Sequence, residues 1–451
     1  MCDTSLATEL FTGTEKRIFA KNSDREPNEA QLILHSPKQN HPKGSFVQCT
    51  FISIPEIETT NEVFLSKPFH MWGAEMGVNE YGLAIGNEAV FTKFKIKKQN
   101  DGLTGMDLLR LALERCRTAK DALGLITELL ETYGQDACGG FENRSFFYHN
   151  SFIIADRSEG FVLETVDRLW VAKPISKFYA ISNGLTIGSD YTLSSENMED
   201  KAIRSGYWKK GKDFSFKEAF SDWFFTKMGH CQNRRLLHES NANTSYKKNG
   251  SYTARNAMDV LRSHAVADSE FEVSSASMSS LCLHATGVLT PNQTNGSLVV
   301  EWNTSAKSND PLRVWYTGTS TPCLSVFKPF FFGTMTISSP CALNPENIDD
   351  TSLWFQHEKI ARRANFDYQT VRAIIVPETK PMESQLFAYT NDGLTESKKN
   401  EVQTKALTDH LELIRKCEEE LKSRNIGKSK WSSPIFQTYW QKQNRKIKIK
   451  L

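Results

Sequence analysis

The chain opens on MCDTSLATEL (residues 1–10), and RIFAKNSDR (residues 17–25) follows after a turn signal at Thr12-Gly13-Thr14. We expect Asp3 to Leu10 to form a short strand and Arg17 to Ala20 a second strand. The second strand would end in the polar cluster Lys21 to Arg25. The chain therefore starts with a hairpin, and the hairpin returns the polar cluster to the neighbourhood of Cys2.

Cys2 is the predicted nucleophile. Methionine before a small residue such as cysteine is normally removed, so Cys2 would carry both a thiol and a free α-amine. The amine has an ordinary pKa of about 8 and can take the proton of the thiol, so one residue supplies nucleophile and base. Asp24 can accept a hydrogen bond from the amine, and Lys21 or Arg25 would lower the pKa of the thiol. The competing interpretation is a polar turn with a surface ion pair.

Amide cleavage also needs donors that point at the developing oxyanion. Asn87 follows the apolar segment Leu83 to Gly86, and Asn183 ends the strand-like segment Phe178 to Ser182. Each side-chain amide is placed where a strand opens on a cleft. An asparagine beside a glycine is otherwise a common turn residue.

The remaining pattern alternates between strand-like and helical segments. From Gly105 to Tyr133 the apolar residues recur with a helical period, and a second helix starts near Thr118 with Asp121 as its capping partner. Strand-like segments flank this pair, which suggests layers of sheet and helix. Further expected elements are strands at 46–64, 152–181, 279–289 and 298–302, a turn at 79–82, helices at 231–237, 254–264 and 352–367, and a loop at 240–251.

The carboxyl-terminal part has a different character. After Pro345 helical patterns dominate, and an apolar stripe at helical spacing runs through Leu407, Leu411, Ile414 and Leu421. We interpret residues 346–451 as a mainly helical extension packed on a main domain of residues 1–345.

Composition excludes several classes of function. Lys and Arg total 55 against 53 Asp and Glu, a formal charge of +2, so nothing global favours nucleic acid or an anionic membrane. No segment is apolar and long enough to span a bilayer, and the first residues do not resemble a secretory signal, so a cytoplasmic protein is expected.

The cysteines and histidines predict neither disulfides nor a metal site. The nine cysteines are scattered, odd in number and without Cys-x-x-Cys pairs. The histidines show no ligand spacing either, so packing or surface roles are expected for His70, His230, His264, His284 and His357. We therefore expect no metal and no organic cofactor.

Several blocks of the sequence resemble the secernin family. They extend from residue 2 to about residue 360, which is most of the chain, and the block around Trp72 to Lys93 is the most specific. The blocks are Met1–Thr4, Ala20–Arg25, Trp72–Gly82, Ile85–Lys93, Gly105–Leu108, Val162–Thr165, Ser325–Phe330 and Trp354–Lys359.

Secernins are similar to bacterial dipeptidases and, more remotely, to bile salt hydrolases and penicillin V acylases. The resemblance implies an α+β chain with a four-layer αββα sandwich and a carboxyl-terminal helical appendage. It implies Cys2 as nucleophile, Asp24 as its orienting carboxylate, and Asn87 and Asn183 in oxyanion or substrate positions. A supporting arginine is also implied, and Arg234 and Arg235 both remain candidates. Where those relatives carry an arginine before the Asn-x-Asp stretch, this chain has Lys21, which keeps the charge but loses the bidentate fork.

The sequence thus predicts a cysteine-type N-terminal-nucleophile amide hydrolase. A dipeptidase that works through an acyl-Cys2 intermediate is the first hypothesis, with a small peptide or amide as substrate. One alternative is a secernin-like regulatory or interaction protein linked to exocytosis, with little or no hydrolase activity. Another is an acylase for non-peptide amides. The sequence leaves the oligomeric state open, a homo-oligomer included.

Overall fold

Two antiparallel sheets form the centre of the molecule. The computed structural model describes residues 1–288, 290–305, 312–335, 351–389, 393–424 and 433–449. The first sheet has the strand order β14-β1-β2-β16-β17-β18, so the chain starts in its interior and not at its edge. Its strands are β1 (Cys2–Ala7), β2 (Lys16–Arg25), β14 (Phe178–Ile181), β16 (Gln293–Asn303), β17 (Leu312–Tyr316) and β18 (Lys328–Phe330).

The second sheet has the order β15-β13-β12-β11-β10-β9-β8-β3. Its strands are β3 (Gln31–Ser36), β8 (Val63–Pro68), β9 (Met76–Asn79), β10 (Ala84–Val90), β11 (His149–Ala155), β12 (Gly160–Val166), β13 (Leu169–Pro174) and β15 (Leu193–Ser194). Two small two-stranded ribbons complete the strands: β4 (Gln39–Asn40) with β7 (Thr59–Thr60), and β5 (Phe46–Gln48) with β6 (Ser53–Pro55).

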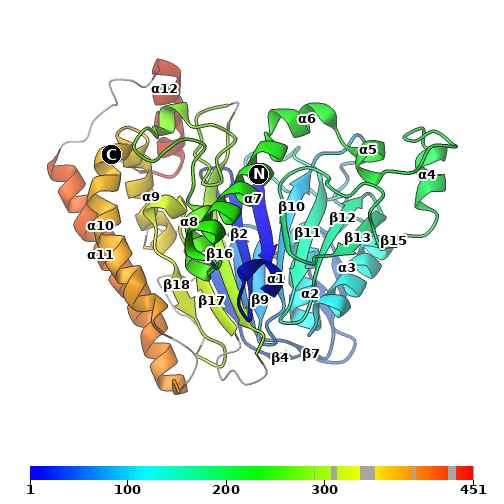
Figure 1. Cartoon of the computed structure of the whole chain (residues 1–451), viewed down its shortest axis with the longest axis horizontal. Helices are drawn as coiled ribbons and strands as arrows, with labels where there is room; N and C mark the ends of the chain where they lie inside the picture. Colours follow the sequence, from blue (N-terminus) through cyan, green and yellow to red (C-terminus); the bar gives the residue numbers. More distant parts are fainter. Residues whose placement is uncertain (289, 306–311, 336–350, 390–392, 425–432, 450–451) are drawn as a thin grey trace.

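Helices cover the outer face of each sheet (Figure 1). The pair α2 (Gly105–Arg115) and α3 (Ala119–Tyr133) packs on the second sheet, and α7 (Cys231–Asn249) and α8 (Ala254–Leu261) pack on the first. Three apolar layers separate the four structural layers. The predicted four-layer αββα sandwich is therefore confirmed. Short helical segments are α1 (Glu9–Thr12), α4 (Met198–Arg204), α5 (Phe216–Phe220), α6 (Trp223–Met228), η1 (Val273–Ser275) and η2 (Pro322–Leu324).

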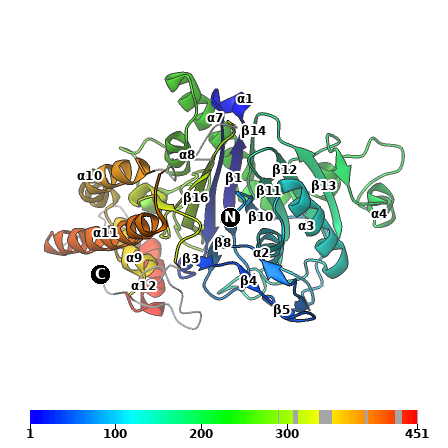
Figure 2. The ribbon, with the colours of Figure 1, turned by 90° about the horizontal axis from the view of Figure 1, so that it is seen from below.

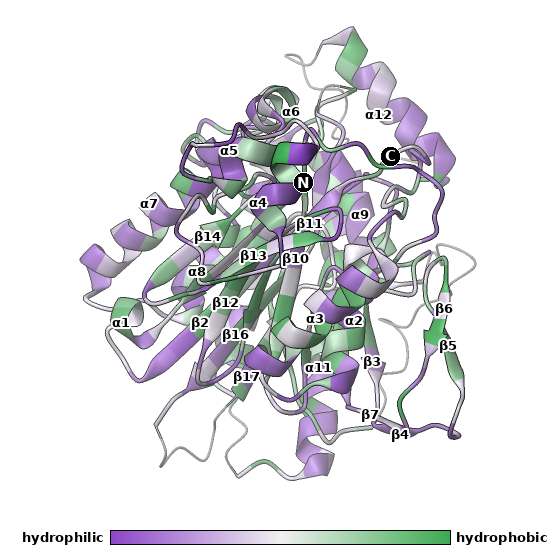
Figure 3. Cartoon of the chain, turned by 90° about the vertical axis from the view of Figure 1, so that its right-hand side faces the viewer, coloured by the Kyte–Doolittle hydropathy of each residue, from purple (hydrophilic) through white to green (hydrophobic). Residues whose placement is uncertain are grey.

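The alternation of side chains along the strands explains how one sheet separates two apolar layers. In β2, Phe19 points into the core between the sheets, whereas its neighbours Ile18 and Ala20 point into the core under α7 and α8. A strand whose residues alternate between two cores is apolar on both faces. The colours of Figure 3 agree, because the central strands are mainly green and white whereas α7 is mainly purple.

The carboxyl-terminal helices lie together on one side of the molecule (Figure 2), where α10 and α11 contact β18 at the edge of the first sheet. They are α9 (Leu353–Ala364), α10 (Tyr368–Phe387), α11 (Glu396–Ser423) and α12 (Pro434–Lys446). The predicted stripe lies on α11, where Leu407, Ile414 and Leu421 are buried. The predicted domain boundary at 345/346 lies outside the described residues. In the part of the chain that the structure describes, no helix has the length and apolarity that crossing a membrane requires.

Three sequence predictions need correction. The predicted loop at 240–251 is wrong, since α7 continues to Asn249 and ends at Gly250 in a left-handed C-cap conformation. The strand predicted at 279–289 is also wrong, since its described part, 279–288, contains no strand and residue 289 lies outside the described residues. The second strand is longer than predicted, because β2 continues beyond Ala20 through the polar cluster Lys21 to Arg25, and β10 likewise continues through Asn87 to Val90.

Candidate active site

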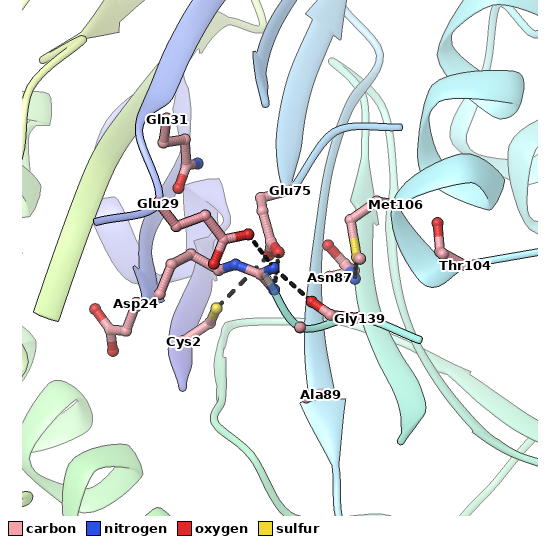
Figure 4. A network of polar contacts seen from close by, with 12 residues as sticks. Cys2, Asp24, Glu29, Gln31, Glu75, Asn87, Ala89, Thr104, Met106 and Gly139 are labelled. Atoms are coloured by element: carbon pink, nitrogen blue, oxygen red, sulfur yellow. Dashed lines mark hydrogen bonds and ion pairs between the residues drawn. The ribbon is translucent and has the colours of Figure 1, made fainter. Parts of the chain in front are cut away.

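Cys2 begins the first strand and is 4% exposed. In the antiparallel register of β1 and β2, Cys2 lies opposite Ser23. Residues that lie opposite each other point to the same face of a sheet, so the thiol shares the face of Ser23, which is turned toward the second sheet. There the Sγ atom donates a hydrogen bond to Oε2 of Glu75 over 3.7 Å (Figure 4). The predicted hairpin does bring the polar cluster beside Cys2.

A cavity of about 100 Å³ opens beside the sulfur. Its walls combine the chain start, the end of β2 and the loop after Cys138. The lining residues are Met1, Cys2, Asp24, Arg25, Glu26, Glu29, Glu75, Ala89, Gly139, Gly140, Asn143, Phe146, Tyr148, Pro291 and Asn292. Charged groups are thus concentrated around the thiol, and acidic side chains outnumber the single arginine.

Arg25 organises one wall of this cavity. Its Nη1 donates to Oε1 of Glu75 over 2.9 Å, and its Nη2 donates to the carbonyl of Gly139 over 2.5 Å and to Glu29. Glu29 is also hydrogen-bonded to His70. Burial alone would raise the pKa of Glu29, but the Arg25 guanidinium and the hydrogen bonds from Arg25 and His70 lower it. Arg25 therefore fixes the Glu75 carboxylate that contacts the thiol, a positioning role that sequence reasoning missed.

Lys21 is buried between the two sheets. Its Nζ donates to the carbonyl of Asn87 over 2.7 Å and forms an ion pair with Glu88 over 3.2 Å. Burial alone would lower the pKa of Lys21, but the surrounding anionic groups raise it, so the side chain is held as a cation. This cation lowers the pKa of the Cys2 thiol, which is the effect expected from the sequence for Lys21 or Arg25.

Asp24 meets the chain start through its backbone and not through its carboxylate. Its N–H donates to the carbonyl of Met1, and its carbonyl accepts from the Met1 ammonium, both over 2.8 Å. The carboxylate points away from the sulfur (Figure 4) and accepts from Oγ1 of Thr294 over 2.6 Å. The second oxygen, Oδ2, is buried without a hydrogen-bond partner in the described part of the chain. Burial raises the pKa of Asp24 to about 7.

Asn183 and Arg234 lie together behind the backbone nitrogen of Cys2. That nitrogen donates to Oδ1 of Asn183 over 2.8 Å, and Nη2 of Arg234 donates to the same oxygen over 2.5 Å. Arg234 also forms a fully buried ion pair with Asp3 over 3.0 Å. Arg235 instead pairs with Glu239 at the surface of α7. Of the two arginines left open by the sequence, the structure places Arg234 at the site.

The side chain of Asn87, another predicted site residue, makes its contacts outside this arrangement. Its Nδ2 donates to Oδ1 of Asn150 over 3.1 Å and contacts the sulfur of Met106 over 3.4 Å. It does not line the cavity, although its backbone carbonyl holds Lys21. The structure therefore brings Cys2, Asp24, Asn183 and Arg234 together. Asn87 is connected to them through its backbone, because its carbonyl holds Lys21 and its N–H donates to the carbonyl of Glu75 over 3.2 Å.

The thiol of Cys2 is held in its neutral form while Met1 is attached. Burial is the main cause and, with Glu75 and Asp24, raises the pKa of Cys2 to about 11, against the opposing effects of Lys21 and the Met1 ammonium. A thiolate is the reactive form of cysteine. The charges that surround Cys2 therefore control its reactivity, and Glu75 is the anion in direct contact.

Replacing Glu75 by glutamine is expected to lower the pKa of Cys2, because it removes the anion that disfavours the thiolate. Each unit of lowering raises the thiolate fraction at pH 8 about tenfold, so Cys2 should react several-fold faster with iodoacetamide. The rate is followed by peptide mass spectrometry between pH 7 and 11 on chain produced with methionine aminopeptidase inhibited, so that Met1 is retained.

The matched control is Glu29→Gln, which removes another carboxylate from Arg25 without touching the sulfur. The interpretation is wrong if both variants label Cys2 at the wild-type rate, or if both accelerate labelling equally.

Within the part of the chain that the structure describes, the residues of this cavity form no cluster with metal-ligand geometry. Among the described residues, a single group of three or more His, Cys, Asp or Glu side chains has ligand atoms that converge closely enough for one ion. It consists of His264, Cys282, His284 and Cys323, none of which lines the cavity at Cys2.

With these four layers, and a cysteine that the first strand carries to a polar cavity, the chain has the architecture of N-terminal-nucleophile hydrolases. Residues 11–143 match the family described as acyl-coenzyme A:6-aminopenicillanic acid acyl-transferase. That match includes Asp24 and Asn87, and it leaves Cys2, Asn183 and Arg234 outside.

Several solved structures are similar to this chain, among them the following three. Penicillin V acylase from Agrobacterium tumefaciens is 13% identical with a TM-score of 0.40, over 73% of this chain and 86% of that one. A conjugated bile acid hydrolase from Clostridium perfringens is 11% identical with a TM-score of 0.35, over 77% and 95%. The Caenorhabditis elegans ortholog of N-acylethanolamine-hydrolyzing acid amidase is 12% identical with a TM-score of 0.34, over 68% and 94%. Because these scores lie below 0.5, the fold assignment depends on the sheets and helices of this chain itself.

Proposed function

We propose that this chain is an amide hydrolase in which Cys2, freed of Met1, is an amino-terminal nucleophile. The observation that supports it most is the position of Cys2, whose sulfur lines a charged cavity while its backbone nitrogen is held by Asn183. Removal of Met1 would turn that nitrogen into an amine beside the thiol, the arrangement that lets one residue act as nucleophile and base.

The geometry suggests a role for each neighbour. The amine takes the thiol proton, and the thiolate attacks the carbonyl carbon of the substrate. The Asp24 N–H, which now donates to the Met1 carbonyl, becomes a free donor once Met1 is gone and is a candidate for the oxyanion. Oδ2 of Asp24 is available to accept a hydrogen bond from the amine. The amine returns its proton to the leaving nitrogen, and water then releases the acyl group from Cys2.

Within this class we propose a secernin-like dipeptidase. The cavity is small, at about 100 Å³, and Met1 itself forms part of its wall, so its loss would enlarge the space by roughly one side chain. The lining combines Glu26, Glu29 and Glu75 with Arg25, an excess of acidic groups that favours a substrate with an ammonium group. A dipeptide fits both the size and the charge.

A neighbouring pocket favours a second candidate, an acylase for non-peptide amides. This pocket, of about 430 Å³, shares Asn143, Phe146 and Tyr148 with the cavity at Cys2, and apolar side chains such as Phe91 and Phe225 line it. An apolar acyl chain could lie there while its amide carbonyl reaches the sulfur.

A substrate panel with an intact-mass measurement tests these candidates. We expect purified chain to lack Met1 and to hydrolyse dipeptides faster than N-acyl amides that carry an apolar acyl group. The reverse preference would select the acylase. Retained Met1 or a blocked amine, with no turnover of either class, would favour the regulatory or interaction protein and contradict the hydrolase proposal.

A further inference from the structure

Two histidines and two cysteines converge behind the candidate active site. His264 follows the end of α8, Cys282 and His284 lie in the loop before β16, and Cys323 lies in η2. One ligand atom from each side chain lies within 4.8 Å of all the others. His264, Cys282 and His284 are buried, and Cys323 is partly exposed.

The distances between these atoms are those of a tetrahedral zinc site. Around one zinc ion, with Zn–N of about 2.05 Å and Zn–S of about 2.3 Å, tetrahedral angles place two nitrogens about 3.4 Å apart and a nitrogen and a sulfur about 3.6 Å apart. The Nε2 atoms of His264 and His284 are 3.4 Å apart. Nε2 of His284 lies 3.5 Å from the sulfur of Cys282 and 3.5 Å from that of Cys323.

Hydrogen bonding alone does not account for this convergence. Three neighbours approach the same Nε2 atom of His284, and a neutral imidazole nitrogen has either one proton or one lone pair. One of the three contacts can therefore be a good hydrogen bond, and the other two would bring polar atoms together without a partner. A central cation that binds two thiolates and two neutral imidazoles satisfies all four groups at once.

The surroundings match those of a bound metal. Nδ1 of His264 lies 3.3 Å from a carboxylate oxygen of Asp268, and Arg372 holds the other oxygen over 2.7 Å. Such a carboxylate partner is common for a metal-ligating histidine, because it fixes the orientation of the ring. The His264 ring also stacks on Phe271 with the centroids 3.6 Å apart, and Tyr368 packs edge-on against it.

We propose that His264, Cys282, His284 and Cys323 form a structural zinc site. Four protein ligands leave no open position for substrate, as in structural and unlike catalytic zinc sites. Binding releases the two thiol protons as the two Zn–S bonds form, and no electron is transferred. A cavity of about 500 Å³ that reaches His264 and Cys323 provides an entry path for the ion.

The site would also support Asp24. Leu283, between two of the ligands, donates its N–H to Oγ1 of Thr294 over 2.9 Å and accepts from the Thr294 N–H over 2.9 Å. The same Oγ1 donates to the Asp24 carboxylate. The metal would thus stabilise, through one threonine, the strand end that contacts the amino terminus.

Metal content of the purified full-length chain is the direct test. We expect about one zinc ion per chain by inductively coupled plasma mass spectrometry. The double variant Cys282→Ser, Cys323→Ser should lose that zinc. The matched control is Cys417→Ser, which removes a buried cysteine that lies in α11, away from the site. This variant should keep its zinc.

Cobalt binding by the wild-type chain gives a second measurement that does not depend on a folded variant. Cobalt(II) in place of zinc should produce the visible bands of a tetrahedral site together with thiolate-to-cobalt charge transfer. A chelator should lower the melting temperature by several degrees, and added zinc should restore it. The proposal is overturned by zinc far below one per chain without the cobalt bands, by a Cys282–Cys323 disulfide in the purified chain, or by a double variant that retains as much zinc as Cys417→Ser.

Discussion

Cys2→Ala is expected to reduce amide hydrolysis by at least about a thousandfold, because the thiolate that forms the acyl intermediate is lost. The fold should persist. The Cys2 backbone amide that bonds Asn183 remains, and the side chain donates only one long hydrogen bond, to Glu75. Turnover of the best substrate from the panel and the melting temperature are measured together.

Two further variants make this result specific. Cys2→Ser should retain far less activity than wild type, since a hydroxyl needs stronger activation than a thiol. Cys49→Ala removes a buried thiol from the core between the second sheet and its helices, and it should leave turnover intact. Full activity in Cys2→Ala would end the proposed mechanism, whatever the other variants show.

Arg234→Met is expected to be the most destabilising single change at the site. The side chain is fully buried and holds Asp3, Ser182 and Asn183 through charged hydrogen bonds. Removing one partner of a buried ion pair leaves the other charge unpaired and costs about 3–5 kcal/mol. Turnover should fall as well, because the Asn183 oxygen that holds the Cys2 nitrogen loses its second donor.

Chemical denaturation measures the loss, and the neighbouring arginine supplies the control. Arg235→Met removes only the surface pair with Glu239 and should change the free energy of unfolding little. Arg234→Lys should fall between wild type and Arg234→Met, because lysine keeps the charge but not the planar set of donors. Equal stability of Arg234→Met and Arg235→Met would contradict the assigned role.

Local pattern was sufficient to predict layers of sheet and helix, whereas the four-layer order came from the resemblance to a known family. The apolar run Ile18 to Ala20 and the cap of α3 at Thr118 are both recognisable within a few residues of sequence, but that the run alternates between two cores is visible only in the structure. The end of α7 was missed because its last turns are polar, and a helix that faces solvent on most sides lacks the apolar stripe on which the prediction depends.

The candidate site was predictable only in part. Cys2 and the polar cluster could be paired because a hairpin connects them. Glu75 was missed because it lies 73 residues from the thiol, and no local pattern indicates that contact. The choice between Arg234 and Arg235 depended on which face of α7 is turned toward the sheet, and the sequence alone does not give that orientation. The cluster around His284 joins separate segments that the sequence spacing does not relate.

The alternation along β2 has a consequence for how this segment can vary. Lys21, Ser23 and Arg25 point to the side of the sheet that holds the thiol. Asn22 instead donates to the carbonyl of Leu261 in α8, and Asp24 accepts from Thr294 in β16. A single-residue deletion or insertion between positions 16 and 25 would exchange the two sets, so that each polar side chain beyond the change would point to the wrong face of the sheet. Point substitutions here should be tolerated more often than indels, and length variation among related chains should be confined to the connections outside this strand.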